Sequence, residues 1–294
     1  LPTAAGPLLF KEYEALYNVL HNAEKPCVFV LGGAKISDAF GMMSPVLENG
    51  TADMILTTGV TGVVFLLASG VNVGEKTMTF LKNKDLLGFV EDAKKYLAEF
   101  PEKIMMPLDV AYEDKDGKRV EIDVKDMPID AIYPDIGPKT VAAYKEVLMN
   151  AKTVFANGPA GVYEDPRFEY GTKAVWSAIA ESPAYSVIGG GDTISSATKF
   201  IDLNDISYVC TGGGAMVRFM SGKKMPLITV LIAAVFNVFG DLYFVAGLHM
   251  GAAGAAIATV MAQALSVVLS VLIIKKRGMP FSFRWHSPLL VSGS

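Results

Sequence analysis

The sequence predicts a three-layer α/β fold, in which helices cover both faces of a mostly parallel sheet, followed by a two-helix transmembrane hairpin. From residue 6 to residue 222, short apolar runs alternate with amphipathic stretches five or six times, which is the pattern of repeated βα units. From Met225 to Ile274 the only formally charged residue is Asp241, as expected of membrane-embedded helices. The mean hydropathy of +0.37 therefore averages two different regions.

The predicted elements between residues 6 and 222 follow one another closely. Short apolar runs predict buried strands, and apolar residues at helical spacing predict the helices between them. The predicted helices cover residues 7–23, 34–47, 63–69, 85–99, 138–150 and 170–181. The predicted strands cover residues 27–31, 54–56, 104–107, 153–156, 186–188 and 208–210. A glycine run and a further helix follow each of the last two strands, and the polar stretch 115–125 predicts a hairpin.

Charge and cysteine content argue against several kinds of site. The 294-residue chain has a net charge of −4 and a pI near 5.5, so we expect no nucleic-acid partner. Cys27 and Cys210 lie in separate apolar strands without a C-x-x-C spacing, which argues against a disulfide framework or a zinc site. Residues 1–3 contain no methionine and start no signal-peptide pattern. We therefore expect the natural start to lie upstream and the α/β region to be cytoplasmic.

Three strand–glycine–helix junctions, at residues 28–35, 187–193 and 209–215, contain the candidate chemistry. Glycine at the carboxyl edge of a sheet lets the backbone approach an anion, and the following helix offers free N–H groups and its positive dipole end. Lys35, Asp192 and Thr193 stand within these junctions. They predict a phosphate-containing ligand, whereas a single such loop could be only a tight turn. Neither a Walker A motif nor G-x-G-x-x-G occurs, which disfavours P-loop and ordinary dinucleotide folds.

Five segments together resemble the successive signatures of the phosphoglycerate kinase family, in its order and at its spacing. They are residues 31–35 (LGGAK), 135–140 (DIGPKT), 157–164 (NGPAGVYE), 189–193 (GGGDT) and 211–215 (TGGGA). The resemblance covers residues 1 to about 222 and implies a Rossmann-like domain, the carboxyl-terminal, nucleotide-binding half of such an enzyme. Ala39, where many members have a second lysine, and the loop 57–65 resemble the archaeal branch. The implied activity is phosphoryl transfer between 1,3-bisphosphoglycerate and ADP in glycolysis, with Mg²⁺.

The resemblance also implies individual roles. It assigns nucleotide binding to Gly32, Gly33, Lys35, Gly59, Gly62, Asn157, Glu164, Gly190, Gly191, Asp192 and Thr193. Lys35 would pair with the phosphates of ADP or ATP, and Asp192 would hold the metal ion. The alternatives are a solvated lysine at position 35 and a helix N-cap at position 192.

Further roles concern the two ends of the nucleotide. The resemblance places Gly59 and Gly62 at the nucleobase and Glu164 at the ribose hydroxyls, although Glu164 could also be an ordinary surface carboxylate. Asn157 would lie beside the terminal phosphate, with Gly191 and Thr193 contacting phosphate at a helix start. The implied catalytic residues, which face the transferring phosphoryl group, are Gly191, Gly213 and Gly214.

Members of this family have a second, amino-terminal half that binds the phosphoglycerate. Residues 1–6 resemble the hinge that enters the helix between the halves, so we expect that half to lie upstream and to be missing. Because phosphoryl transfer depends on positioning and on cations at the moving group, we expect the chain to bind ADP or ATP without turning over 3-phosphoglycerate.

The tail after the junction 223–226 predicts two transmembrane helices within residues 227–274, over 227–245 and 250–274, inserted in a lipid bilayer. Lysine and arginine residues before and after them predict that both ends, including the polar tail 275–294, are cytoplasmic. Two very apolar soluble helices are the alternative.

Residues 226–283 resemble one helix pair of the multidrug and toxic compound extrusion (MATE) transporters, mainly over 236–241, 249–259 and 275–278. Three alternatives to a kinase domain therefore stay open: a transporter fragment, a membrane-anchored nucleotide-binding module, and an artefactual chimera.

Overall fold

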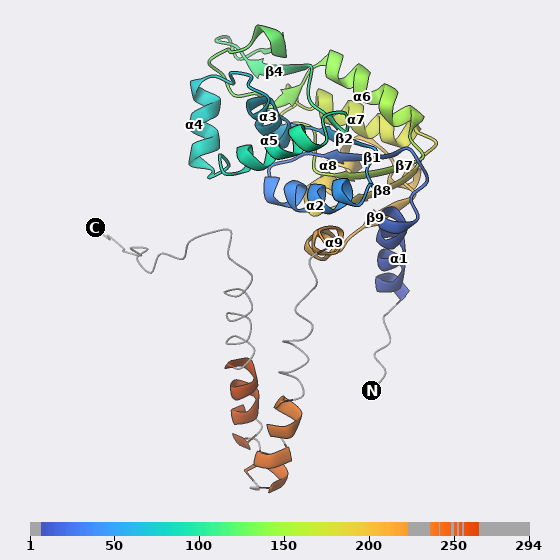
Figure 1. Cartoon of the computed structure of the whole chain (residues 1–294), viewed down its shortest axis with the longest axis vertical. Helices are drawn as coiled ribbons and strands as arrows, with labels where there is room; N and C mark the ends of the chain where they lie inside the picture. Colours follow the sequence, from blue (N-terminus) through green and yellow to red (C-terminus); the bar gives the residue numbers. More distant parts are fainter. Residues whose placement is uncertain are drawn as a thin grey trace, which may run out of the picture. The chain divides into compact units, whose positions relative to one another are not determined.

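The computed structural model describes residues 7–222 and, beyond them, residues 236–240, 242–247, 250–251, 253–254 and 256–264 (Figure 1). The chain divides into two compact units, Leu1–Lys223 and Lys224–Ser294. Each unit is described by itself below.

The first unit is built on a six-stranded parallel sheet with the strand order β3-β2-β1-β7-β8-β9. The strands are β1 (Cys27–Leu31), β2 (Met54–Thr57), β3 (Ile104–Met105), β7 (Thr153–Asn157), β8 (Tyr185–Gly189) and β9 (Tyr208–Cys210). Leu31 pairs with both Thr57 and Asn157, which aligns the carboxyl ends of the three central strands. The predicted parallel sheet is confirmed.

Helices cover both faces of this sheet, as predicted (Figure 1). They are α1 (Pro7–His21), α2 (Ile36–Glu48), α3 (Gly59–Ala68), α4 (Glu75–Asn83), α5 (Phe89–Glu99), α6 (Pro138–Asn150), α7 (Tyr170–Glu181), α8 (Gly191–Phe200) and α9 (Gly213–Met220). Alternation along β1 separates two cores, because successive strand side chains point to opposite faces. Phe29 packs with α2, α3 and α9, whereas Val28 and Val30 pack with α6, α7 and α8.

A second, antiparallel sheet joins β4 (Asp109–Glu113), β5 (Arg119–Asp123) and β6 (Asp135–Ile136), with a short 3-10 turn, η1 (Val124–Asp126), after β5. The predicted hairpin is therefore present, although its first strand begins earlier, at Asp109. The buried Asp109 carboxylate accepts hydrogen bonds from the backbone N–H groups of Lys139 (2.9 Å) and Thr140 (2.8 Å). Both lie in the first turn of α6, where N–H groups lack helical partners, so Asp109 anchors that helix.

Several element boundaries differ from the prediction, and one helix was not predicted. Helix α3 begins at Gly59, four residues before the predicted start at residue 63. The prediction missed its first turn because the buried residues of α3 lie all around the helix and leave no helical periodicity in the sequence. Helix α4 was missed since only Thr77 and Leu81 of its nine residues are buried, too few to mark a face. A 3-10 turn, η2 (Leu203–Asp205), precedes β9.

In the second unit, the described residues form short helical pieces, including the π-helical turn η3 (Leu242–Gly247). The Asn237 side-chain amide donates to the Thr259 hydroxyl over 3.3 Å, and a Cβ added to Gly240 would lie 3.0 Å from the Ala258 Cβ. Within the described residues, no helix is long and apolar enough to cross a membrane. The predicted hairpin over 227–274 therefore has no support there. Its residues 227–235 and 265–274, the junction 223–226 and the tail 275–294 lie outside the described residues.

Candidate functional site

Two cavities adjoin at the carboxyl edge of the six-stranded sheet, where ligands bind in open α/β sheets. The first, called the glycine cavity, has a volume of about 330 Å³ and lies between the end of β7 and the starts of α8 and α9. The second, called the apolar cavity, has a volume of about 510 Å³ and extends toward α3 and α4. Gly33, Ala34, Pro159 and Asp192 line both, so one ligand can occupy the two cavities together.

The structure brings most of the predicted site residues together. The glycine cavity is lined by Gly32, Gly33, Lys35, Asn157, Gly190, Gly191, Asp192, Thr193, Gly213 and Gly214. Gly59 and Glu164 line the apolar cavity instead. Asp38 and Gly158, which were not predicted as site residues, also line the glycine cavity.

The glycine cavity depends on backbone segments that approach each other too closely for side chains. Gly158 has a φ of +88°, and a Cβ added to it would lie 2.3 Å from the Gly32 carbonyl oxygen. The N–H of Gly158 donates to the Thr193 hydroxyl (2.8 Å), and the N–H of Gly32 donates to the Asn157 carbonyl (2.9 Å). These contacts hold the loops after β1, β7 and β8 against one another along one side of the cavity.

Lys35 and Asp192 form an exposed ion pair in this cavity, whereas Asp38 is partly buried. The Lys35 ammonium lies 3.3 Å from Asp192 Oδ2, and the two side chains are 69% and 63% exposed. An ion pair this open to water adds little stability, so both groups are free to exchange their partner for a ligand. The Asn157 side chain is held in place because its amide donates to the Gly189 carbonyl over 2.6 Å.

Open space lies at the starts of α8 and α9. Within the described part of the chain, chain neighbours aside, no atom lies within 4 Å of a Cβ added to Gly191 or Gly214, and the nearest atom to one added to Gly213 is the Gly190 Cα at 3.9 Å. Helix starts carry unpaired N–H groups and a partial positive charge. The bare backbone here therefore forms a cradle suited to an anion.

The third glycine run is already held by an acidic side chain of α1. Glu12 Oε1 accepts hydrogen bonds from the N–H and hydroxyl of Thr211 (2.7 Å each) and from the N–H of Gly212 (3.2 Å). This contact joins residues about two hundred positions apart, so sequence patterns could not indicate it. Burial, reinforced by the negative charge of Glu12, raises the pKa of the neighbouring Cys210 thiol to about 11.

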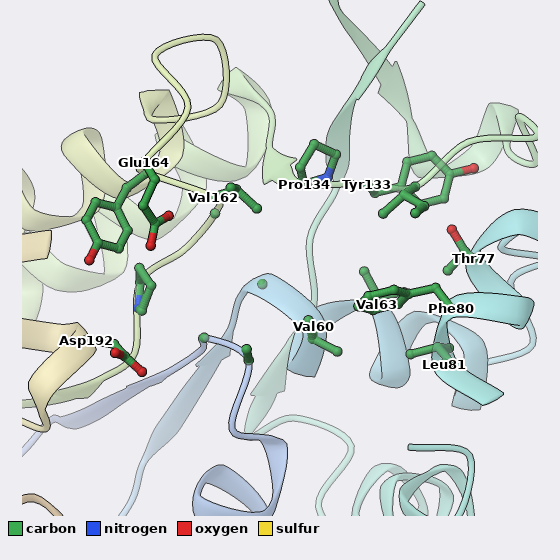
Figure 2. Close-up of a pocket in the computed structure, with 17 residues that line it drawn as sticks. Val60, Val63, Thr77, Phe80, Leu81, Tyr133, Pro134, Val162, Glu164 and Asp192 are labelled. Atoms are coloured by element: carbon green, nitrogen blue, oxygen red, sulfur yellow. The ribbon is translucent and has the colours of Figure 1, made fainter. Parts of the chain in front are cut away.

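The apolar cavity runs from a polar end to an apolar end (Figure 2). Figure 2 shows Glu164 and Asp192 at one end, and Phe80 and Leu81 of α4 at the other. At the α4 end the Thr77 hydroxyl donates to the Ala131 carbonyl over 2.7 Å, so its proton is engaged and only its oxygen can still accept a hydrogen bond. Recognition at that end therefore rests mainly on shape and apolar contact.

The apolar end is built by Val60, Val63, Thr77, Phe80, Leu81, Ile132, Tyr133 and Pro134, which come from two helices and a loop. Val60 and Val63 belong to the loop 57–65, which the resemblance assigns to the nucleobase. The other six were not predicted, because no motif distinguishes them from core residues. The missed helix α4 supplies three of them.

The loop that carries Glu164 is fixed by Lys199 of α8. The Lys199 ammonium donates to the Tyr163 carbonyl (2.8 Å) and to Glu169 Oε2 (2.7 Å). Burial raises the pKa of Tyr163, and the negative charges of Glu164 and Asp192 raise it further. The exposed Glu164 carboxylate thus stands on an anchored loop beside the cavity.

The two glycines predicted to line a nucleobase slot have different surroundings. Gly59, with a φ of +54°, lines the apolar cavity and packs against the Gly33 backbone. Gly62 is buried within α3, where an added Cβ would lie 3.0 Å from the Pro107 ring. Gly62 lines neither cavity, so here it supports helix packing.

A buried carboxylate, Asp135, lies behind the apolar cavity. Its Oδ2 accepts hydrogen bonds from Arg119 (2.7 Å) and from the N–H of Gly171 (2.9 Å). Its Oδ1 has no hydrogen-bond partner in the described part of the chain, and Cβ atoms added to Gly161 or Gly171 would lie 2.3 Å from it. Burial raises the pKa of Asp135 to about 6, and the favourable bonds to Gly171 and Arg119 offset this only in part.

The residues of the glycine cavity fit a Mg²⁺ ion that arrives with phosphate. Among the described residues, no three His, Cys, Asp or Glu side chains gather as a metal cage. Mg²⁺ is commonly bound by one or two carboxylates plus substrate phosphates and water. Asp192, with Asp38 in the same cavity, supplies that smaller set.

Comparison with known proteins agrees with this geometry. The sequence model of the family described as phosphoglycerate kinase matches residues 1–223. The chain belongs to the phosphoglycerate kinase family. The enzyme of Methanothermus fervidus is 46% identical over 231 residues, which is 79% of this chain and 56% of that protein. The enzyme of Pyrococcus furiosus is 44% identical over 234 residues, or 78% of this chain and 57% of that protein.

Solved structures of the family show the same fold. The crystal structure of phosphoglycerate kinase from Pyrococcus horikoshii superposes with a TM-score of 0.71 at 41% identity, covering 77% of this chain and 56% of that one. The structure from Coxiella burnetii gives 0.67 at 34% identity, covering 77% and 58%. The chain thus spans little more than half the length of these relatives. They confirm the predicted family and its archaeal relatives, and give no support to a transporter fragment.

Proposed function

We propose that residues 1–223 bind Mg-ADP or Mg-ATP and act in phosphoryl transfer between 1,3-bisphosphoglycerate and ADP in glycolysis. The observation that supports this is the pair of adjoining cavities. One offers glycine amides, an ammonium group and a carboxylate, and the other offers apolar walls. A nucleoside diphosphate has the matching form, with a polyanionic end and a flat apolar end.

In this proposal the phosphates lie in the glycine cavity, against the starts of α8 and α9. Lys35 exchanges Asp192 for a phosphate oxygen, and Asp192 then holds the metal ion, which neutralises charge on the phosphates. Asn157, Gly191 and Thr193 position the phosphates nearest the sheet. Gly213 and Gly214 face the phosphoryl group that is transferred, where bare amides can stabilise its charge without reorganising.

The nucleoside lies in the apolar cavity. Glu164 accepts hydrogen bonds from the ribose hydroxyls, and the base packs between Gly59, Val60 and Pro134. The anchored loop around Tyr163 keeps Glu164 in place, so this end contributes orientation. Orientation is a large part of what a phosphoryl-transfer site supplies. We propose a cytoplasmic location for this region, in keeping with a glycolytic role.

Calorimetry on the full chain tests the proposal. Mg-ADP should bind the unaltered protein, and Asp192→Ala should weaken binding by about tenfold, the loss typical of one charged contact. Asp205→Ala, an exposed carboxylate outside both cavities, should bind like the unaltered protein. Absence of binding heat with both ADP and ATP would contradict the proposal. A coupled assay with 3-phosphoglycerate tests the separate expectation that this chain binds the nucleotide without turnover, and normal turnover would contradict that expectation.

The transporter alternative and the membrane hairpin over 227–274 gain no support from the family matches or from the described helices. We do not propose a transport function.

A further inference from the structure

A third cavity lies on the other side of α4 from the apolar cavity. This outer cavity has a volume of about 420 Å³ and is open to solvent. It shares Phe80 and Ile132 with the apolar cavity, so these two side chains line both spaces. Figure 2 shows Phe80 at the end of the apolar cavity that lies opposite Asp192 and Glu164.

We propose that Phe80 and Ile132 form a wall that limits the size of the base accepted by the site, and that shortening this wall admits adenine nucleotides substituted on the 6-amino group. The inference rests on the proposed function. If phosphates and ribose are held near Asp192 and Glu164, the base edge farthest from the ribose points toward α4. In adenine that edge bears the 6-amino group.

The backbone on both sides of the wall is anchored independently of the two side chains. The Thr77 hydroxyl donates to the Ala131 carbonyl over 2.7 Å, and the N–H of Lys76 donates to Asp130 Oδ1 over 3.1 Å. The Tyr133 hydroxyl donates to the Ile129 carbonyl over 2.8 Å. Helix α4 and the segment 129–133 should therefore keep their positions when a wall side chain is shortened.

The side chains themselves can be shortened at small cost to folding. Ile132 is 47% exposed, and Phe80 is only partly buried against the core. Beyond them the outer cavity is lined mainly by polar residue types, including a Lys76–Asp130 ion pair at 3.6 Å whose side chains are 64% and 63% exposed. A substituent that passes the wall would meet apolar contacts first and solvent next, so it needs no buried polar partner.

Titration of the full chain with Mg-ADP and with Mg-N6-benzyl-ADP tests the wall. The unaltered protein should bind ADP at least about tenfold more tightly, since a pocket that lacks room for added apolar groups discriminates by roughly that factor or more. Ile132→Ala should weaken ADP binding by about threefold, because the base loses its contact with the isoleucine side chain. It should also bring the affinities for ADP and N6-benzyl-ADP close together. Phe80→Leu should shift the ratio in the same direction by a smaller factor.

Leu108→Ala is the matched control, because Leu108 is 48% exposed and lines none of the three cavities. It should leave the ratio of the two affinities unchanged. If ADP binds and both wall variants keep the same ratio of ADP affinity to N6-benzyl-ADP affinity as the unaltered protein, the proposal that Phe80 and Ile132 limit the size of the base is refuted. If ADP does not bind the unaltered protein, the proposed function fails instead. Far-ultraviolet circular dichroism of each variant shows that it is folded.

Discussion

At the glycine cavity, much of the lining is glycine backbone, because the loops after β1, β7 and β8 touch one another, and a few polar side chains such as Lys35, Asn157 and Asp192 stand among these glycines. At the apolar cavity, the ligand-facing groups are side chains from α3, α4 and the segment 132–134, and the backbone lies behind them. The cavities share four residues, yet they should respond differently to mutation. A methyl group added where the loops of the glycine cavity touch, at Gly32 or Gly158, disrupts the site, whereas a side chain can be shortened at the other end without loss of the fold.

The largest effect is expected at Gly158. Gly158→Ala places a methyl group 2.3 Å from the Gly32 carbonyl and requires an L-residue at a φ of +88°. Overpacking and a left-handed backbone conformation together should lower the free energy of unfolding by roughly 3–5 kcal/mol. Urea denaturation measures this loss, and Mg-ADP binding should be lost with it.

Gly50→Ala separates the two causes. Gly50 has a φ of +69° with no atom within 4 Å of an added Cβ, so only the conformational cost of about 1 kcal/mol remains. Equal losses in the two variants would contradict the close approach of the loops.

The second effect concerns Asp135, behind the apolar cavity. Its pKa is raised from 3.8 to about 6, so between these values the folded chain holds a proton that the unfolded chain has lost. The free energy of unfolding should therefore decrease as pH rises from about 4 to 6, by roughly 3 kcal/mol in total. Above that range the loss persists.

Asp135→Asn should remove this decrease, because asparagine does not titrate. Urea denaturation of both proteins from pH 4 to pH 7 gives the difference between their free energies of unfolding at each pH. The contributions of other carboxylates, such as the partly buried Asp123 with its lowered pKa beside Lys139, cancel in this difference. A difference that does not change with pH would show that Asp135 is ionised throughout.

The contrast between the two ends also explains what the sequence could predict. The glycine cavity follows from local motifs, since each strand–glycine–helix junction lies within eight consecutive residues and parallel strands bring their carboxyl ends to one edge. Gly32, Lys35, Asp192 and Gly214 were therefore located correctly at that edge. The six parallel strands could also be predicted from local sequence, because buried strands form continuous apolar runs.

The part of the apolar end that α4 and residues 132–134 build was not predicted, because its side chains resemble ordinary core residues. Phe80 and Ile132 are separated by some fifty positions and meet only through tertiary packing. Glu12 was missed for the same reason, since its partners lie at the other end of the unit. Gly62, which the resemblance places at the nucleobase, lines neither cavity and packs within α3 against Pro107. Local patterns thus locate a site built by backbone turns, and give little information on one built by side chains from separate elements.

The third effect tests the charged character of the glycine cavity. Lys35→Ala should weaken Mg-ADP binding by about tenfold at low salt, equivalent to about 1.4 kcal/mol, and should reduce the dependence of affinity on salt. Binding of adenosine, which would occupy only the apolar cavity, should be unaffected. Lys94→Ala, a surface lysine paired with Glu91 on α5, is the control. Equal weakening of ADP and adenosine would contradict the division of the site into two ends.

The smallest effect is expected at Glu12, which joins α1 to the start of α9. Glu12→Gln keeps the shape of the side chain but removes the negative charge that faces the Thr211 and Gly212 N–H groups. Charged hydrogen bonds at a helix start are worth more than neutral ones, so the free energy of unfolding should fall by about 1 kcal/mol. Glu14→Gln, at an exposed position of the same helix, should change it by less than about half as much. If the two variants lose the same amount, the Glu12 contact contributes nothing beyond an ordinary surface carboxylate. The third glycine run would then differ from the other two loops of the glycine cavity, which the Thr193 hydroxyl and the Asn157 amide hold in place.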